Sequence, residues 1–247
     1  MKRLLDAGRG SGAWAVGTPR LPRGTVWILA ACTYFVTSGC ASAPSLPPLA
    51  PVDAGRLARA AEGASALEGA YRLVFEWSLD EPSTRLRGRG VARVEGPYRA
   101  RLDLFLSNGE RAAAAALVED ELRTAEGGRA DLPPAPFLWG ALGVFRPGES
   151  SLLAGGSGSR TGMSELRYAP TGGGELRFRL ENGRLEGIEA VRADRAVEEL
   201  WLEQEQGARF PRQATYRHVR EVRELRITLE SVENVETFPS EIWDPGS

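Results

Sequence analysis

After residue 70 the chain alternates between apolar and polar side chains, and this pattern constrains its fold more than any other feature. One face of the first such segment is apolar throughout: Tyr71, Leu73, Phe75, Trp77 and Leu79. In the next segment one face carries arginines and the other small or aliphatic residues: Arg85, Arg87, Arg89 and Arg93 against Leu86, Gly88, Gly90, Ala92 and Val94. A period of two places successive side chains on opposite faces of a β-strand. The pattern therefore predicts an antiparallel sheet with one wet and one apolar face.

Turn signals separate these segments from one another. Residues 80–83 (Asp-Glu-Pro-Ser) predict a turn, Gly96-Pro97 breaks the second strand, and Asn108-Gly109 is the strongest hairpin signal in the chain. The same alternation predicts further strands at about 98–107, 111–119, 121–125, 163–169, 175–181, 184–192, 195–203, 211–219 and 222–232. A mainly β domain with ten or eleven such strands is expected to form a strongly curved sheet or a barrel.

Helices are predicted in two places. Asp53 is a candidate N-cap for an alanine-rich helix that runs to Leu67 and that Gly69 can end. The apolar, proline-containing segment 131–145 lacks the period of two, and a short helix is expected to begin at about Pro136. A second short helix is expected over 148–154, followed by a flexible loop over 155–159.

The first 39 residues have the features of a targeting segment. Arg20 and Arg23 precede the uncharged apolar run 26–36, which is much shorter than the roughly 20 apolar residues of a spanning helix. Because the stretch before Arg20 is long for a signal sequence, translation starting downstream of Met1 is one alternative. Residues 37–40 (Thr-Ser-Gly-Cys) resemble the bacterial lipobox, which implies cleavage between Gly39 and Cys40 and lipid on Cys40. The alternative is a free, buried cysteine behind an ordinary signal sequence.

The remainder divides into a proline-rich tether with the acylated cysteine (40–52) and one domain (53–247). Cys32 lies in the apolar run, so the processed chain keeps one cysteine and has no internal disulfide. The whole chain has 31 Lys and Arg residues against 33 Asp and Glu; residues 1–39 hold five and one of them, which leaves 26 against 32. A net charge of −6 with no basic cluster argues against nucleic-acid binding.

The processed chain offers few residues for catalysis. Its one histidine, His218, lies on a predicted strand between arginines and is expected to be a surface or packing residue. The sequence contains no Gly-x-Ser-x-Gly motif and no His, Cys or carboxylate cluster with metal-ligand spacing. Residues 155–160 lack the Gly-Lys-Ser/Thr ending of a phosphate loop. We therefore expect no enzyme activity, no metal and no cofactor.

The order of elements over residues 53–245 resembles the LolA/LolB-like carriers and receptors of outer-membrane lipoproteins. LolB-like lipoproteins are the most similar locally, through residues 98–107 (a strand leading into a short loop) and through 130–133 and 137–140 (a lid segment). This resemblance implies an open, unclosed antiparallel β-barrel of about eleven strands, with helices as a lid over a cavity for acyl chains. One departure is the loop at 107–110: in LolB it carries an exposed leucine used at the membrane, and here it is short and polar.

A barrel of this size cannot easily fill its interior with side chains, and an apolar helix across its open end would enclose a ligand site. The residues expected to line that cavity are Phe75, Trp77, Leu102, Leu104, Phe137, Leu138, Trp139, Leu142 and Phe145. The alternative is that these side chains form an ordinary core.

Two functions are compatible with this sequence. The first is a lipoprotein of the outer membrane, anchored by lipid and facing the periplasm, that binds acyl chains or lipidated proteins and transfers them without bond chemistry. Ala41, the residue after the lipobox cysteine, favours the outer membrane because aspartate there retains such proteins at the inner membrane. The second is a periplasmic sensor or structural lipoprotein that binds a protein partner through the same fold, and the polar loop at Asn108-Gly109 favours it.

Overall fold

The computed structural model describes residues 49–124 and 132–245. The predicted signal sequence (1–39), the lipobox residues Gly39 and Cys40, and the tether up to residue 48 lie outside the described residues. The elements within the described ranges are β1 (Ala50–Pro51), α1 (Ala54–Ser65), β2 (Ala70–Glu81), β3 (Thr84–Glu95), β4 (Arg99–Leu106), β5 (Arg111–Val118), β6 (Glu121–Thr124), α2 (Ala135–Ala141), β7 (Ser151–Gly158), β8 (Met163–Pro170), β9 (Glu175–Glu181), β10 (Arg184–Arg192), β11 (Arg195–Glu203), β12 (Gln213–His218), β13 (Arg223–Val235) and the 3₁₀ helix η1 (Ser240–Trp243).

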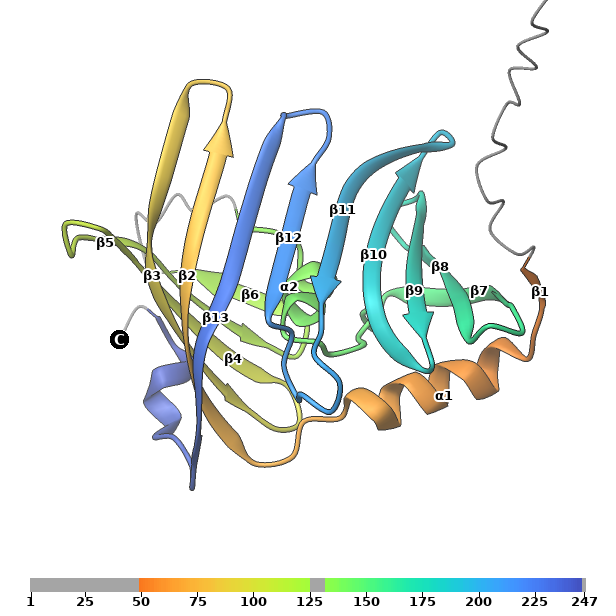
Figure 1. Cartoon of the computed structure of the whole chain (residues 1–247), viewed down its shortest axis with the longest axis horizontal. Coiled ribbons are helices and arrows are strands. Elements are labelled where there is room, and N and C mark those ends of the chain that lie inside the picture. The colour runs from red at the N-terminus through yellow and green to blue at the C-terminus, as the bar shows by residue number, and fades with distance from the viewer. Residues whose placement is uncertain (1–48, 125–131, 246–247) are drawn as a thin grey trace, which may run out of the picture. The chain divides into compact units, whose positions relative to one another are not determined.

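All described strands belong to one antiparallel sheet of 13 strands. Its order is β1-β7-β8-β9-β10-β11-β12-β13-β2-β3-β4-β5-β6, so the two halves of the chain meet where β13 pairs with β2. The sheet curls around α2 and stays open, because its edge strands β1 and β6 do not pair with each other (Figure 1). This confirms the predicted mainly β, open-barrel architecture, with an N-terminal helix and a lid helix.

Two of the three predicted helices form, and a cap or a proline favours the first turn of each. Asp53 caps α1 by accepting a hydrogen bond from the Arg56 N–H at 3.0 Å. α1 ends at Ser65, earlier than predicted, and Gly69 (φ +81°) instead bends the chain into β2. α2 begins at Ala135 behind Pro134, as predicted within one residue. The helices in the described ranges are too short or too polar to cross a membrane.

The two strands beyond the predicted eleven are β1 and β7. The predicted helix over 148–154 and the predicted loop over 155–159 were wrong, because Ser151–Gly158 pairs with β8 along its whole length. A short helix is marginal alone, whereas pairing with the edge of β8 satisfies the backbone of this segment. Residues 50–52, the end of the predicted tether, pair with β7 in turn, and the Val52 N–H donates to the Gly156 carbonyl at 3.2 Å.

Two clusters of buried side chains occupy the concave side of the sheet. The first joins α1, the start of α2 and strands β8–β12, and Phe137, Phe145, Phe178 and Tyr216 are among its members. The second joins β2–β5, the middle of α2 and the β11–β12 loop. α2 thus contributes to both, since Phe137 faces the first cluster and Trp139 the second. The two halves differ in how completely side chains fill them.

Candidate functional site

The half of the barrel around β2–β5 contains an apolar pocket. Its floor is the concave face of β2–β5 and β13, and its other walls come from α2 and the β11–β12 loop. The lining is apolar throughout: Leu73, Phe75, Ala92, Ala100, Leu102, Ala115, Leu117, Leu122, Leu132, Leu138, Ala141, Leu142, Phe210, Pro211, Ala214, Ile227 and Leu229. Apolar walls without a charged group suit a hydrocarbon ligand.

The pocket exists because small residues alternate with large ones across the strands. In one cross-strand row Leu73 lies opposite Ala92, Ala92 opposite Leu102, and Leu102 opposite Ala115. Neighbouring strands lie about 4.8 Å apart, so each alanine leaves a gap between two leucines. The alanine run at 112–116 supplies part of this space, with Ala113 and Ala115 on the concave face.

Aromatic side chains of β2 cover glycines of β3 beside the pocket. Phe75 lies opposite Gly90, and a Cβ atom built on Gly90 would come within 2.3 Å of the Phe75 ring. Trp77 lies opposite Gly88, and its indole N–H donates to the carbonyls of Arg89 and Phe105, both at 3.2 Å. Gly90 therefore gives the Phe75 ring room over β3, a known pairing of aromatic rings with strand glycines, whereas a Cβ atom on Gly88 would collide with the Phe105 carbonyl.

The pocket is small in this structure. The space inside it that the centre of a water molecule can occupy has a volume of about 60 Å³. One water needs roughly 10–15 Å³ by this measure, so the space equals a few waters. A long acyl chain therefore fits only if a wall moves, and α2 and the β11–β12 loop are the walls that are not part of the sheet.

The nine residues predicted to line a cavity fall into three groups. Phe75, Leu102, Leu138 and Leu142 lie in the wall of the pocket. Leu104, Trp77 and Trp139 belong to the surrounding cluster, where the buried Trp139 donates its indole N–H to the Glu119 carbonyl at 2.7 Å. Phe137 and Phe145 lie in the other half of the barrel, away from the pocket lining.

That other half is filled by stacked aromatic side chains. Phe145 contacts Phe178 edge to face at 4.9 Å between ring centroids, and Phe137 contacts Tyr216 at 5.4 Å. Burial raises the pKa of Tyr216, and the hydrogen bond from its hydroxyl to Glu198 (2.7 Å) acts in the same direction. Burial likewise raises the pKa of Tyr168 to about 12. The predicted cavity is thus confined to one half of the barrel.

Several lining residues were missing from the sequence prediction. The alanines on β3, β4 and β5 were overlooked because the prediction favoured large side chains, whereas a pocket requires small ones. Phe210 and Pro211 lie in a loop whose position depends on contacts distant in sequence, including the edge-to-face contact of Phe210 with Tyr71 at 5.1 Å. The alanine run at 112–116 was the one available signal.

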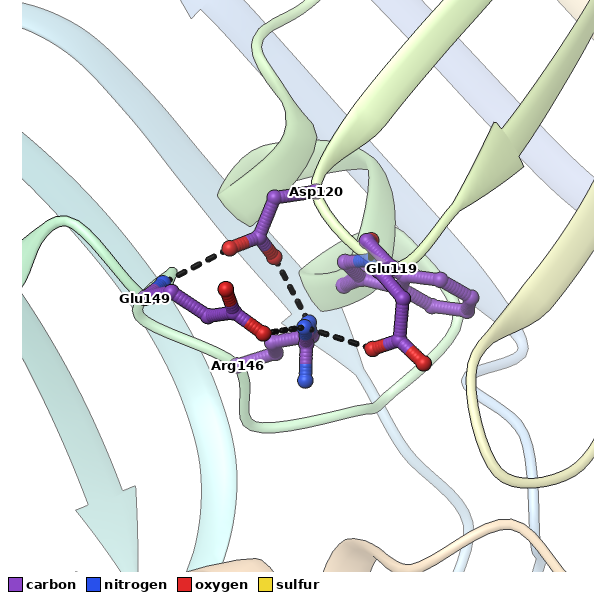
Figure 2. Close-up of polar contacts among 5 residues, drawn as sticks. Glu119, Asp120, Arg146 and Glu149 are labelled. Carbon is purple, nitrogen blue, oxygen red and sulfur yellow. Dashed lines mark hydrogen bonds and ion pairs between the residues drawn. The ribbon is translucent and has the colours of Figure 1, made fainter.

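A polar clamp fixes the segment after α2 to the β5–β6 turn (Figure 2). Arg146, 12% exposed, contacts Asp120 at 2.6 Å, Glu119 at 2.8 Å and Glu149 at 3.7 Å. Its guanidinium also lies 4.0 Å from the ring centroid of Tyr98. The Glu149 N–H donates to the other oxygen of Asp120 at 2.6 Å. These contacts hold α2 against the pocket from its C-terminal side.

Polar chemistry is sparse around the pocket. Within 49–124 and 132–245 no group of three His, Cys, Asp or Glu side chains is placed to hold a metal. His218 lies at the end of β12, where its Nδ1 accepts a hydrogen bond from the Glu221 N–H at 3.2 Å. It is a turn residue outside the pocket lining.

Proteins with a similar fold are found among the solved structures. No protein-family model matches the sequence, and no curated protein matches it. A domain named as an outer membrane lipoprotein-sorting protein from Vibrio parahaemolyticus superposes with a TM-score of 0.50 and 11% identity, over 77% of this chain and 97% of that one. This chain shares the fold of that domain.

Two further solved structures are similar in extent. A LolA superfamily protein from Nitrosomonas europaea gives a TM-score of 0.48 with 9% identity, over 78% of this chain and 97% of that one. A DUF1329 family protein from Desulfovibrio piger ATCC 29098 gives 0.49 with 12% identity, over 77% and 95%. The fold assignment rests on the Vibrio domain and on neither of these two structures.

Proposed function

We propose that this protein is a lipoprotein of the outer membrane, anchored through Cys40 and facing the periplasm, that binds acyl chains or lipidated proteins and transfers them without bond chemistry. The observation that carries the proposal is the apolar pocket between β2–β5 and α2. The fold shared with the Vibrio sorting domain and the lipobox-like residues 37–40 support it.

The size of the pocket suggests how binding proceeds. Because the enclosed volume holds only a few waters, an acyl chain must displace α2 with the following Leu142, or the β11–β12 loop. Each methylene that leaves water contributes about 0.8 kcal/mol, so a chain of ordinary length can offset a local movement of this kind. Contacts between the acyl chain and the pocket then replace the apolar contacts that α2 loses when it moves.

The test is the uptake of a fluorescent fatty acid by the full-length chain with Cys40→Ala. We expect saturable uptake, and we expect Ala115→Leu to weaken it at least tenfold, since leucine at this buried position fills the space between Leu102 and Leu117. Ala112→Leu is the matched control, because Ala112 is an exposed alanine on the same strand. No saturable uptake by the parent chain, or equal uptake by both alanine variants, would refute acyl binding in this pocket.

A second candidate is a periplasmic sensor or structural lipoprotein that binds a protein partner. The β4–β5 turn favours it, because residues 107–110 are all exposed and polar and offer no apolar side chain to a membrane. Pull-down from native membranes separates the two functions. One stoichiometric protein partner favours the sensor, and many different lipoproteins favour the carrier.

A further inference from the structure

Two arginines converge on a cleft on the far side of the pocket wall. The cleft has an open volume of about 260 Å³ and lies between the end of α1, the β9–β10 turn and the β11–β12 loop. Arg184 and Arg209 line it together with Ser65 and Gln204. No acidic side chain belongs to its described lining, and Leu185 is the one large apolar residue in it.

Backbone carbonyls hold both guanidinium groups in place. Arg184 donates to the carbonyls of Ala208 (2.6 Å) and Glu205 (3.4 Å). Arg209 donates through one nitrogen to the carbonyls of Ser65 (2.8 Å) and Ala66 (3.1 Å), which compensates the negative end of the α1 dipole. Each guanidinium has five N–H donors, so both retain donors for a further acceptor.

The positive charge of this pair is not neutralised locally. Within the described residues, no carboxylate oxygen lies within 4.0 Å of either guanidinium, whereas the similarly shielded Arg101 and Arg146 are paired with Asp103 and Asp120. Burial lowers the pKa of Arg209, and the nearby charge of Arg184 lowers it further. Tyr71 and, to a smaller extent, Glu68 act in the opposite direction on the pKa of Arg209.

We propose that this cleft binds a phosphate-type oxyanion, which accepts hydrogen bonds from Arg184 and Arg209 at once. Two forked cations that share one anion give short, charge-assisted hydrogen bonds, and the anion removes the repulsion between them. A partly buried site of this kind excludes much of the screening that weakens surface ion pairs.

The position of the cleft connects it to the pocket. Leu142 lines the pocket and the next residue, Gly143, lines the cleft; likewise Phe210 and Arg209 face opposite sides. A Cβ atom built on Gly143 would lie 3.1 Å from Pro211 Cδ, so the wall is thin there. Two sources of the anion are compatible with this geometry: a free phosphate, or the headgroup of an amphiphile whose chain enters the pocket. The second source rests on the proposed function and the first does not.

The experiment is calorimetric titration of the full-length chain at fixed ionic strength with inorganic phosphate and, separately, with octyl phosphate. We expect Arg184→Gln to weaken phosphate binding on the order of tenfold, the typical effect of losing a hydrogen bond to a charged group. Arg209→Lys should also weaken it, because lysine keeps the charge and loses the fork. Arg212→Gln, on the same loop and 60% exposed, is the matched control.

The two ligands distinguish the two sources. Equal affinities for the two ligands indicate that the site binds a free anion. If octyl phosphate binds more tightly, and Ala115→Leu reduces its affinity to that of inorganic phosphate, the site binds a headgroup. If the fatty acid is not taken up while phosphate binds in an Arg184-dependent manner, the proposed function fails and the anion site stands. The absence of phosphate binding by the parent chain, or equal binding by the Arg184→Gln and Arg212→Gln variants, would overturn the anion site.

Discussion

At the residue scale, the features that make the pocket are small side chains opposite large ones. Strand periodicity alone assigns Phe75 and Leu102 to the concave face, and both lie in the pocket wall. Phe137 and Phe145 lie outside the strands, so this periodicity does not place them, and on α2 Phe137 and Trp139 face different halves of the barrel although they are two residues apart. Gly90 shows a second limit, since its role depends on the ring that lies over it.

The buried tyrosines of the filled half predict a pH dependence of stability. An ordinary tyrosine has a pKa of about 10, and the folded state holds the pKa of Tyr168 at about 12. The folded state therefore favours the neutral phenol, so this stabilisation is complete below about pH 10 and is lost as pH rises from about 10 to about 12. We expect the urea midpoint of unfolding to fall across this window, and to fall less in Tyr168→Phe. Identical losses in the variant and the parent chain would contradict the assignment.

At the element scale, α2 is a pocket wall outside the sheet, and the polar clamp fixes the segment that follows it. Most elements were predictable, because alternation, Asn108-Gly109 and Asp53 each specify local structure. β7 was not, since its strand form depends on the edge of β8. Nor was the clamp, because Arg146 and Asp120 are 26 residues apart in the sequence and their contact depends on the tertiary structure.

Removing the clamp should loosen α2 without unfolding the sheet. Arg146→Gln leaves Glu119, Asp120 and Glu149 close together with no cation between them. We expect faster amide hydrogen exchange in residues 135–150, unchanged exchange in α1, and faster fatty-acid uptake. Arg123→Gln is the control, since its pair with Glu121 is exposed. Unchanged exchange in 135–150 would show that the clamp does not hold α2.

At the scale of the whole molecule, the paired residues begin earlier than the predicted end of the tether at residue 52. Because residues 50–52 pair with β7, a tether from a lipidated Cys40 would span at most residues 41–49. At about 3.1 Å per residue in an extended proline-rich form, it reaches less than about 30 Å. The open-barrel architecture was predictable from the number of alternating segments. Which half of the barrel stays hollow was not, because it depends on how both clusters pack around α2.

The anchor itself has a direct test. Several acyl chains on Cys40 would bury many methylenes at about 0.8 kcal/mol each, so attachment should be effectively permanent. We expect Cys40→Ala to block cleavage after Gly39 and to leave an uncleaved or mislocalised precursor with an intact domain. Mass spectrometry of the mature N-terminus of the parent chain checks this. A lipid-free terminus, or cleavage at another bond, would exclude the anchor.

The central claim, that an acyl chain lies between β2–β5 and α2, is tested most directly by cross-linking with a photoreactive fatty acid. The full-length chain is irradiated with the bound probe, digested, and mapped by mass spectrometry. We expect labelled residues from both walls of the pocket, with Leu102 on β4, Leu138 on α2 and Leu229 on β13 as the principal sites. Labelling confined to the exposed Leu152 of β7, or to the filled half around Phe178, would contradict the claim.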